Sequence, residues 1–317
     1  MERIGKTSSY SVTDEVLEVN AQKPGEPKKP PLVKAVRMDG GIGFQIPTDM
    51  HVDGSSSGTL KVELVGEEES FLYVFKYGLH EKGSKEWLIS AGADTMSHWN
   101  LHQHFRVDEK APIRSDAVAG FEQWVDPDGD NLARLLHTLH SQDREFRKEF
   151  DDSMTAAFGQ TYEELVFVPT ADGRIQMKIR WRSLKKPQSA SALSDGTLRY
   201  LYLMAILLNP SPPSLICIDE PETGLHPSMF PLVAEAAQEA AMRTQVILTT
   251  HSPEFLNHFT EAEKETGGVV SVMYLKDGAS EIRRLSGEPL TSWLKRYKLG
   301  QLMMSGELEE LAEEDDE

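Results

Sequence analysis

The chain has 317 residues, a single cysteine and a formal net charge of −18 at pH 7. This length allows one large hydrophobic core or two smaller ones, and the acidic balance argues against a globally basic nucleic-acid-binding protein. Cys217 has no partner for an internal disulfide, and we expect it to be a small buried hydrophobic residue. No apolar run approaches the roughly 20 residues that cross a bilayer, so we expect a cytoplasmic protein without membrane contact.

The first 118 residues divide into two segments by composition. Residues 1–31 are polar and end in two lysines and two prolines, which favours a flexible lead-in. Residues 32–118 hold short β-like runs at 60–65 and 71–75, separated by turns rich in glycine and serine. We therefore predict that the β-rich segment is the remainder of an N-terminal lobe.

Three histidines, His98, His102 and His104, lie close together near the end of this segment. The first two have the i, i+4 spacing of a helical metal site. His104 falls off that face, and no cysteine or nearby carboxylate completes a set of ligands. Apolar residues are interleaved with the histidines, so we favour a packed amphipathic segment over a metal site.

The middle of the chain predicts a helical insertion followed by a β-hairpin. Residues 119–160 form the insertion, in which leucines and phenylalanines recur at helical spacing between 131 and 158. Residues 164–182 alternate as two strands with a turn at 171–173, where the sequence is Ala-Asp-Gly. From about 161 to 300 the chain alternates strands and helices, which predicts an α/β lobe with a parallel sheet.

Basic side chains alternate with apolar ones along the second strand of this hairpin. The basic strip consists of Arg174, Lys178, Arg180, Arg182, Lys185 and Lys186. Such a strip could hold a phosphate backbone, and this hypothesis predicts that charge reversal at Arg180 and Arg182 weakens salt-sensitive DNA binding. The favoured interpretation is the solvent face of a half-buried strand.

The sequence LSDGT at 193–197 predicts the start of a helix. Ser194 and Asp195 are good N-cap residues, Gly196 allows close backbone approach, and apolar residues follow at helical spacing. Backbone N–H groups at such a helix start bind phosphate. Taken alone, the motif is more simply an ordinary capped helix, and Asp195 is an unusual neighbour for a phosphate.

A continuous apolar run at 215–218 ends in Asp219 and Glu220. The run predicts a strand buried on both faces of a parallel sheet, and the two acids then lie at its carboxyl end, where such sheets bind ligands. Asp219 can hold Mg²⁺, and Glu220 can orient and deprotonate an attacking water. A second run at 246–248 leads to His251, which we expect beside the acids as a sensor of a γ-phosphate.

These motifs together resemble one family. ALSDGTLRYL, IDEPETGLHP and TTHSPEFL, in this order and spacing, resemble the C-terminal lobe of ABC-type ATPases of the soluble RecF/SMC-like AAA group, over about 191–257. The resemblance implies a P-loop NTPase fold, ATP and Mg²⁺ as cofactors, and a dimer. It implies Ser194, Asp195, Gly196 and Thr197 as the nucleotide-binding signature loop, Asp219 as the Walker B metal ligand, and Glu220 and His251 as catalytic base and switch histidine.

The sequence departs from this family in one respect. No GxxxxGKS or GxxxxGKT loop is present; Gly5-Lys6-Thr7 is favoured as a chance tripeptide. The main hypothesis is an ATP-hydrolysing enzyme linked to DNA repair or defence, acting as a homodimer or with a partner that carries Walker A. The alternatives are a truncated or non-catalytic subunit that lends its signature loop in trans, and, less favoured, a transporter ATPase subunit.

The last segment, 301–317, is strongly acidic. Eight acids and no base lie between Glu307 and Glu317. We expect a solvated, disordered tail.

Overall fold

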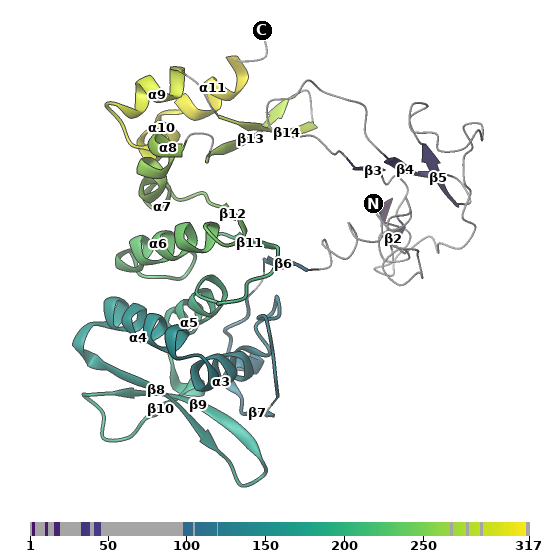
Figure 1. Ribbon diagram of the computed structural model, residues 1–317. Helices are drawn as coiled ribbons and strands as arrows, with labels where there is room; N and C mark the ends of the chain where they lie inside the picture. The colour runs from purple at the N-terminus through teal and green to yellow at the C-terminus, as the bar shows by residue number, and fades with distance from the viewer. Residues whose placement is uncertain are drawn as a thin grey trace. The chain divides into compact units, whose positions relative to one another are not determined.

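A computed structural model describes residues 98–314, apart from 104, 119, 267–268, 277–278 and 286–287, together with short strands nearer the N-terminus. The chain divides into two compact units, Met1–His98 and Trp99–Glu317. In the first unit, β1 (Glu2–Arg3) pairs with β2 (Tyr10–Ser11), and β3 (Val16–Val19), β4 (Val33–Met38) and β5 (Gly41–Gln45) form an antiparallel sheet (Figure 1). The range predicted as a flexible lead-in therefore contains strands. The strands predicted at 60–65 and 71–75 lie outside the described residues.

A parallel sheet lies at the centre of the second unit, in the order β12-β11-β6 (Figure 1). Its strands are β6 (Trp99–His102), β11 (Leu215–Asp219) and β12 (Gln245–Thr249), all parallel. The α/β class with a parallel sheet, predicted from the sequence, is confirmed. The i, i+4 helical spacing weighed for His98 and His102 does not apply, because four residues from Trp99 onward pair as a strand with β11.

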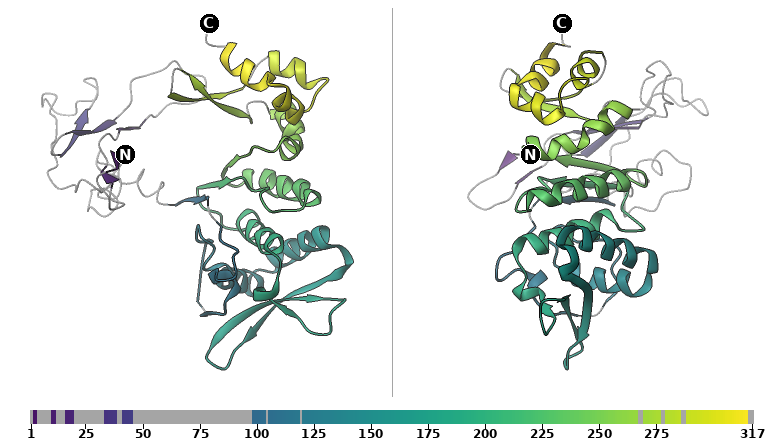
Figure 2. Two further views of the ribbon diagram at one scale, coloured as in Figure 1. Left: turned by 180° about the vertical axis from the view of Figure 1, so that it is seen from behind. Right: turned by 90° about the vertical axis from the view of Figure 1, so that its left-hand side faces the viewer.

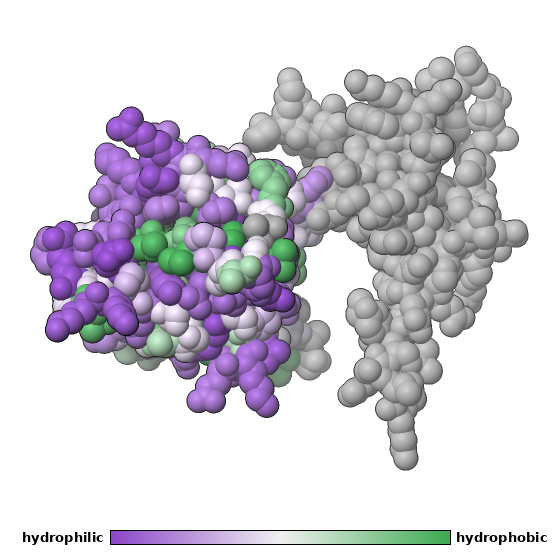
Figure 3. All heavy atoms as spheres, turned by 90° about the horizontal axis from the view of Figure 1, so that it is seen from below, coloured by the Kyte–Doolittle hydropathy of each residue, from purple (hydrophilic) through white to green (hydrophobic). Residues whose placement is uncertain are grey.

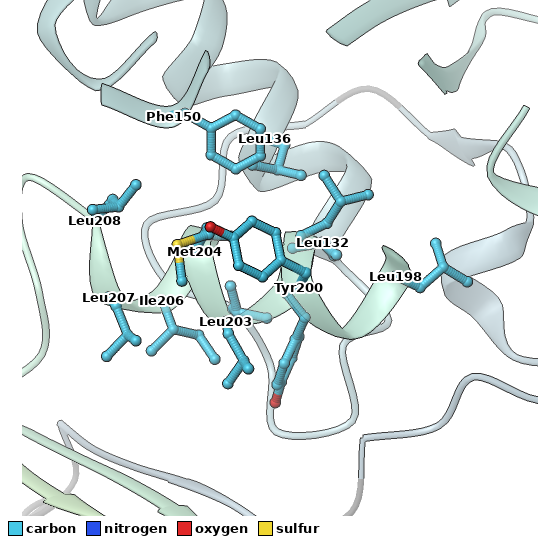
Figure 4. Close-up of a cluster of buried hydrophobic side chains, with 14 of the residues drawn as sticks. Leu132, Leu136, Phe150, Leu198, Tyr200, Leu203, Met204, Ile206, Leu207 and Leu208 are labelled. Atoms are coloured by element: carbon cyan, nitrogen blue, oxygen red, sulfur yellow. The ribbon is translucent and has the colours of Figure 1, made fainter. Parts of the chain in front are cut away.

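Two helices cover one face of this sheet. Helix α5 (Asp195–Leu207) is apolar on nearly all sides, and residues 197–207 are buried except Arg199, as expected for a helix enclosed in a core. Helix α6 (Phe230–Ala241) packs on α5 and on β12. Ile216 and Ile218 of β11 point into the same core. In Figure 4, Tyr200 of α5 lies among Met204, Phe150 and Leu136, and its hydroxyl is 2.7 Å from Ser153 Oγ.

The predicted insertion and hairpin are both present. Helices α3 (Leu132–Gln142) and α4 (Arg144–Phe158) pack on a sheet of β10 (Gln188–Ser189), β9 (Arg174–Trp181), β8 (Tyr162–Pro169) and β7 (Ala117–Val118) (Figure 2). Asp143 begins α4, because its carboxylate accepts from the backbone N–H groups of Glu145 and Phe146, both at 2.9 Å. Viewed from below, the surface of the second unit is mainly hydrophilic, with small hydrophobic groups between the polar side chains (Figure 3).

The C-terminal part has its own core. It comprises α7 (Pro253–Leu256), α8 (Thr260–Thr266), the antiparallel hairpin β13 (Ser271–Lys276) and β14 (Ala279–Arg284), α9 (Glu288–Leu294), α10 (Leu299–Ser305) and α11 (Glu307–Glu314). The prediction of a disordered tail over 301–317 is wrong up to residue 314. The reason is an apolar stripe in the acidic sequence, because Leu308 and Ala312 are buried on one side of α11.

Short 3-10 helices join these elements. They are η2 (Pro112–Arg114), η3 (Gly159–Thr161), η4 (Ala190–Ala192), η5 (Pro227–Met229) and η6 (Asn257–Phe259). Within the described part of the chain, no helix is long and apolar enough to span a bilayer.

Candidate active site

The carboxyl edge of the central sheet brings polar residues from neighbouring strands together. Asp219, the last residue of β11, is in register with Thr249, the last residue of β12. The Thr249 hydroxyl donates to the Asp219 carboxylate, and the Glu220 N–H lies 3.2 Å from both the carbonyl and the hydroxyl oxygen of Thr249. The ends of the two strands are thereby joined, and Asp219 is held in a fixed orientation.

Glu220 leaves the strand in a left-handed conformation. Its φ is 44°, and no other non-glycine residue in the described part of the chain has a positive φ. This conformation is unfavourable by roughly 1–2 kcal/mol for a residue with a side chain. The Thr223 hydroxyl donates to Glu220 Oε2 at 3.0 Å, and the Thr223 N–H donates to the Glu220 carbonyl, also at 3.0 Å. Strain held by surrounding hydrogen bonds is characteristic of functional residues, so the outlier supports a role for Glu220.

His251 lies beside this glutamate. Its Nε2 is 3.9 Å from Glu220 Oε1, and the side chains are 87% and 43% exposed, respectively. A ligand can therefore reach both groups from solvent. The structure thus brings together Asp219, Glu220 and His251, the three residues that the sequence predicted for one site.

Glu222 and Thr250 form a second connection between the two loops, which the sequence analysis did not identify. The Thr250 hydroxyl donates to Glu222 Oε1 and accepts from the Ser252 N–H at 3.0 Å. Glu222 is buried, and its Oε2 atom has no hydrogen-bond partner among the described residues. This pair flanks His251, so it fixes the loop from which the histidine projects.

The LSDGT sequence, proposed as a signature loop, lies at the start of α5, where a helix start is predicted. Ser194 Oγ accepts from the Thr197 N–H at 3.1 Å and lies 2.7 Å from Thr197 Oγ1. The N–H groups of Asp195 and Gly196 remain at the open helix end. In the described part of the chain, Ser194 and Asp195 make no hydrogen bond or ion pair to Asp219, Glu220 or His251. The signature loop and the acidic edge are therefore separate groups of residues in this chain.

Arg114 holds the signature loop in place. Its guanidinium is 2.5 Å from Asp195 Oδ1, and its Nη1 donates to the carbonyls of Leu193 at 2.8 Å and of Ala190 and Ser191 at 3.4 Å. The Arg114 side chain is only 10% exposed, whereas Asp195 is largely exposed. The cation offsets the negative charge of Asp195 beside the helix start. No sequence motif indicates this residue, because it lies about 80 positions upstream of the loop.

Glycines let the signature helix approach the turn after the acidic strand. A Cβ on Gly196 would lie 3.0 Å from the Gly224 carbonyl oxygen, and a Cβ on Gly224 would lie 2.9 Å from Arg199 Nε. Gly224 also has a φ of 76°, which disfavours any side chain there. The LSDGT and GLHP motifs are therefore packed backbone against backbone.

Gln103 is a further polar residue at the carboxyl edge of the sheet. It directly follows His102, the last residue of β6, which is in register with Ile218. It is exposed, and its amide carbonyl is a hard oxygen ligand. No sequence motif indicates Gln103, because the apolar residues interleaved with the nearby histidines predict an amphipathic packing segment.

The predicted packing role of the histidine segment fits His102. Its Nδ1 is 2.5 Å from the Tyr202 hydroxyl inside the core, and burial lowers the pKa of His102 to about 4. His104 lies outside the described residues. The described residues contain no cluster of three or more histidine, cysteine or acidic side chains placed to hold a metal ion.

Cys217 is half-buried rather than fully buried as the sequence predicts. Its burial, and to a smaller extent the nearby Asp219 charge, raises the pKa of its thiol.

Comparison with known proteins places this site in a family. Residues 103–257, just under half of the chain, match the family model described as "AAA domain, putative AbiEii toxin, Type IV TA system". This segment is similar to that AAA domain family. It contains LSDGT, the acidic strand β11 and His251, and the match confirms the predicted likeness to AAA-type ATPases. No curated protein matches the chain.

Several solved structures resemble the chain at low identity. A structure from work on ATP-driven dimerization and DNA-stimulated activation of SMC ATPases is 15% identical, with a TM-score of 0.35, over 47% of this chain and 89% of that one. An SMC head bound to the C-terminal winged-helix domain of ScpA is 11% identical, with a TM-score of 0.47, over 80% and 68% of the two chains. An SMC head with an extended coiled coil, bound to the C-terminal domain of ScpA from Pyrococcus furiosus, is 15% identical, with a TM-score of 0.37, over 47% of this chain and 37% of that one. The likeness to AAA domains therefore rests on the family match alone.

Proposed function

We propose that this AAA-like segment binds ATP and hydrolyses it at the carboxyl edge of the central sheet. The observation that carries the proposal is the convergence of Asp219, Glu220 and His251 there, with Glu220 held in a left-handed conformation. A soluble ABC-type ATPase needs a metal ligand, a base and a phosphate sensor at such an edge, and each is available.

The residues at this edge fit a magnesium ion and a nucleotide. Asp219 offers carboxylate oxygens, which Mg²⁺ prefers, and Thr249 orients that carboxylate. When bound, the ion would neutralise phosphate charge and fix the phosphate oxygens. Glu220 is the proposed base that accepts a proton from the attacking water, and His251 is the proposed hydrogen-bond partner of the terminal phosphate.

The signature loop is proposed to bind nucleotide separately from this edge. Ser194, Asp195, Gly196 and Thr197 would contact phosphate through the backbone N–H groups at the start of α5. Arg114 makes this feasible because it balances the Asp195 carboxylate. Since the loop makes no polar contact with the acidic edge of its own chain, we propose that it acts on nucleotide held by a second protomer in a dimer.

A second candidate function is that of a subunit completed by another chain. Strand β12 pairs only with β11 among the described residues, and the apolar Trp99, Leu101 and Ile247 are exposed. Parallel sheets are ordinarily buried on both faces. A partner that carries a Walker A loop would cover such a surface, and this chain would then lend LSDGT in trans.

We further propose a link to DNA repair or defence, with DNA as a partner. The support is the description of the matched family, which names a toxin of a type IV toxin–antitoxin system. The transporter alternative is disfavoured, because GLHP at 224–227 replaces the sequence that transporter ATPases carry there.

The test of hydrolysis is the Glu220→Gln variant. We expect kcat for ATP to fall by about 10²–10⁴-fold, the usual contribution of a general base, while nucleotide affinity changes only a few-fold. Glu239→Gln, on the exposed side of α6, is the matched control and should turn over ATP like the parent chain. Equal turnover by Glu220→Gln and the parent chain would contradict the assigned role. If the parent chain binds no nucleotide, hydrolysis by this chain alone is excluded and the trans-acting subunit is favoured.

A further inference from the structure

The turn between α9 and α10 concentrates basic and aromatic side chains. It reads Trp-Leu-Lys-Arg-Tyr-Lys at 293–298, and we call these residues the WLKRYK turn. Leu294 is buried in the C-terminal core, and the other five residues of the turn are exposed. In a chain with a net charge of −18, this is a local surface of opposite sign.

The two aromatic rings lie together on this surface. Trp293 and Tyr297 are 37% and 43% exposed, and their ring centroids are 5.6 Å apart, with an angle of 47° between the ring planes. The N–H groups of Arg296 and Tyr297 both donate to the Trp293 carbonyl at 3.0 Å, which closes the turn. Each ring therefore offers a partly free face, and stacking on such faces is how proteins hold unpaired bases.

The basic side chains of the turn have no acidic partner among the residues that the structure describes. Lys295, Arg296 and Lys298 form no ion pair within the described part of the chain. In the basic strip on β9, by contrast, Arg180 is 2.9 Å from Glu164 and Arg174 is 3.3 Å from Asp172. The other four cations of the strip form no ion pair among the described residues, so the feature that distinguishes the turn is its pair of exposed aromatic rings.

Helix α10, which follows the turn directly, is hydrogen-bonded to the segment after α7. The Leu299 N–H donates to Thr260 Oγ1 at 3.2 Å, and the Gly300 N–H donates to Asn257 Oδ1 at 2.9 Å. Leu299 is fully buried. A surface that is ordered before binding loses little conformational entropy when it binds a ligand.

We propose that the WLKRYK turn binds single-stranded nucleic acid, with bases stacked on Trp293 and Tyr297 and phosphates on Lys295, Arg296 and Lys298. An anionic membrane is disfavoured, because a bilayer would face a wide area of a chain whose net charge is −18. A narrow strand within a Debye length of about 8 Å experiences mainly the local cations. This proposal deepens the DNA link of the proposed function, yet its test needs no ATP, so the two proposals can fail separately.

The experiment measures fluorescence anisotropy of a labelled dT oligonucleotide of about 20 nucleotides, which exceeds the roughly 4–16 that such sites cover. The full-length chain without nucleotide is compared with Lys295→Glu/Arg296→Glu and with Lys185→Glu/Lys186→Glu, an equal charge change at exposed positions. We expect at least a tenfold loss of affinity in the first variant only. The slope of log K against log salt should fall by about 1.4, since each lost phosphate contact on a single strand removes about 0.7.

Two variants of Tyr297 test the contribution of the aromatic rings to binding. Tyr297→Ala should weaken dT binding about tenfold, whereas Tyr297→Phe should retain it, because stacking needs the ring and not the hydroxyl. Lysine acetylation of the parent chain gives a readout that does not depend on the stability of any variant. Bound dT should protect Lys295 and Lys298 and leave Lys185 and Lys186 reactive.

Four outcomes would overturn the proposal. The first is equal weakening of dT binding by the two charge variants, and the second is loss of dT binding in Arg180→Glu/Arg182→Glu but not in the turn variant. The third is tighter binding of duplex DNA than of dT. The fourth is binding of anionic vesicles that depends on the turn, while dT affinity does not depend on it. A matched rU oligonucleotide distinguishes the two sources of the single strand, and preferential binding of either one supports the proposal.

Discussion

Arg114 illustrates how much of the site depends on single side chains outside the motifs. It is the buried member of an ion pair with Asp195, and its guanidinium also reaches Val107 O at 2.9 Å and the carbonyls before α5. Hydrogen bonds that involve a charged group contribute about 1.5–3 kcal/mol each, and an unpaired buried carbonyl is unfavourable. The shape of the signature loop therefore depends on this residue.

We predict that Arg114→Ala lowers the free energy of unfolding by roughly 2–4 kcal/mol and increases amide hydrogen exchange at 190–196. Arg114→Lys should recover only part of the loss, because an ammonium group cannot match the planar fork of a guanidinium. Arg106→Ala is the control, since the Arg106–Asp108 pair is exposed on both sides and such pairs contribute about 0–1 kcal/mol. Equal effects of Arg114→Ala and Arg106→Ala in urea unfolding would contradict the prediction.

The residues around the acidic edge show how far residue-level prediction reaches. Asp219, Glu220 and His251 are predicted for one site because each follows an apolar run that ends at the same edge of a parallel sheet, and the structure places them at that edge. Glu222 and Thr250 were missed, because their hydrogen bond links two loops about 28 positions apart and neither residue has a distinctive local pattern. The motif does not indicate that Glu220 has a strained backbone or that Glu222 is buried.

At the scale of elements, α10 crosses α7 at a distance that only glycine allows. A Cβ on Gly300 would lie 1.8 Å from the Pro253 carbonyl oxygen and 2.6 Å from its carbonyl carbon. Helix α7 begins directly after the switch histidine loop, where Ser252 Oγ accepts from the Phe255 N–H at 3.2 Å. The C-terminal helices are therefore fixed to the element that holds the site.

Gly300→Ala should destabilise the chain by roughly 1–3 kcal/mol or more, because the obstructing atoms belong to backbone that cannot move aside. Gly120→Ala is the matched control: the added Cβ would meet only Arg134 Cδ, at 3.7 Å, which is an ordinary contact. Urea unfolding followed by circular dichroism measures both variants. A Gly300→Ala variant as stable as Gly120→Ala would refute the close crossing.

Elements with a long periodic pattern were predicted well, and short or mixed ones were not. The helices at 132–158 and the hairpin at 162–181 repeat their period over many residues. Strand β6 has only four residues. Such a short segment shows little of the two-residue alternation of a strand, so the i, i+4 spacing of the histidine pair suggests a helix instead. In α11 the acidic residues dominate the composition, although a few apolar residues on one side suffice to dock the helix.

At the scale of the whole molecule, His102 links three parts of the main core. The Tyr202 hydroxyl donates to the Pro127 carbonyl at 3.0 Å, so its single hydrogen is used, and His102 Nδ1–H donates to the hydroxyl oxygen. Strand β6, helix α5 and the loop at 127 are thus joined through the Tyr202 hydroxyl, to which the neutral His102 imidazole donates. Its Nε2 is buried and has no partner among the described residues, so a proton there would be unfavourable.

Global stability should therefore decrease in acid through His102. Its pKa is about 4 in the folded chain against 6.5 for an exposed histidine, so the unfolded chain takes up a proton first as pH falls. Above about pH 6.5 the imidazole is neutral in both states, so His102 adds no pH dependence to the free energy of unfolding. By about pH 4.5, protonation of the unfolded chain lowers that free energy by about 2–3 kcal/mol. The free energies of unfolding of the parent chain and of His102→Asn should be measured above about pH 6.5 and at about pH 4.5. The difference between the two proteins should be about 2–3 kcal/mol smaller at the lower pH. Tyr202→Phe should retain the acid-dependent loss, and an unchanged difference for His102→Asn would contradict the assignment.

The sequence by itself determined the parts whose cause is local. Apolar runs specify the strands, Ser194 caps α5, and the Asp219–Glu220 pair follows its strand, because propensity and periodicity act over neighbouring residues. Only the tertiary structure decided that Arg114 contacts the LSDGT loop and that Gly300 meets Pro253. These features join residues far apart in the chain, and their distances are set by packing rather than by any local pattern.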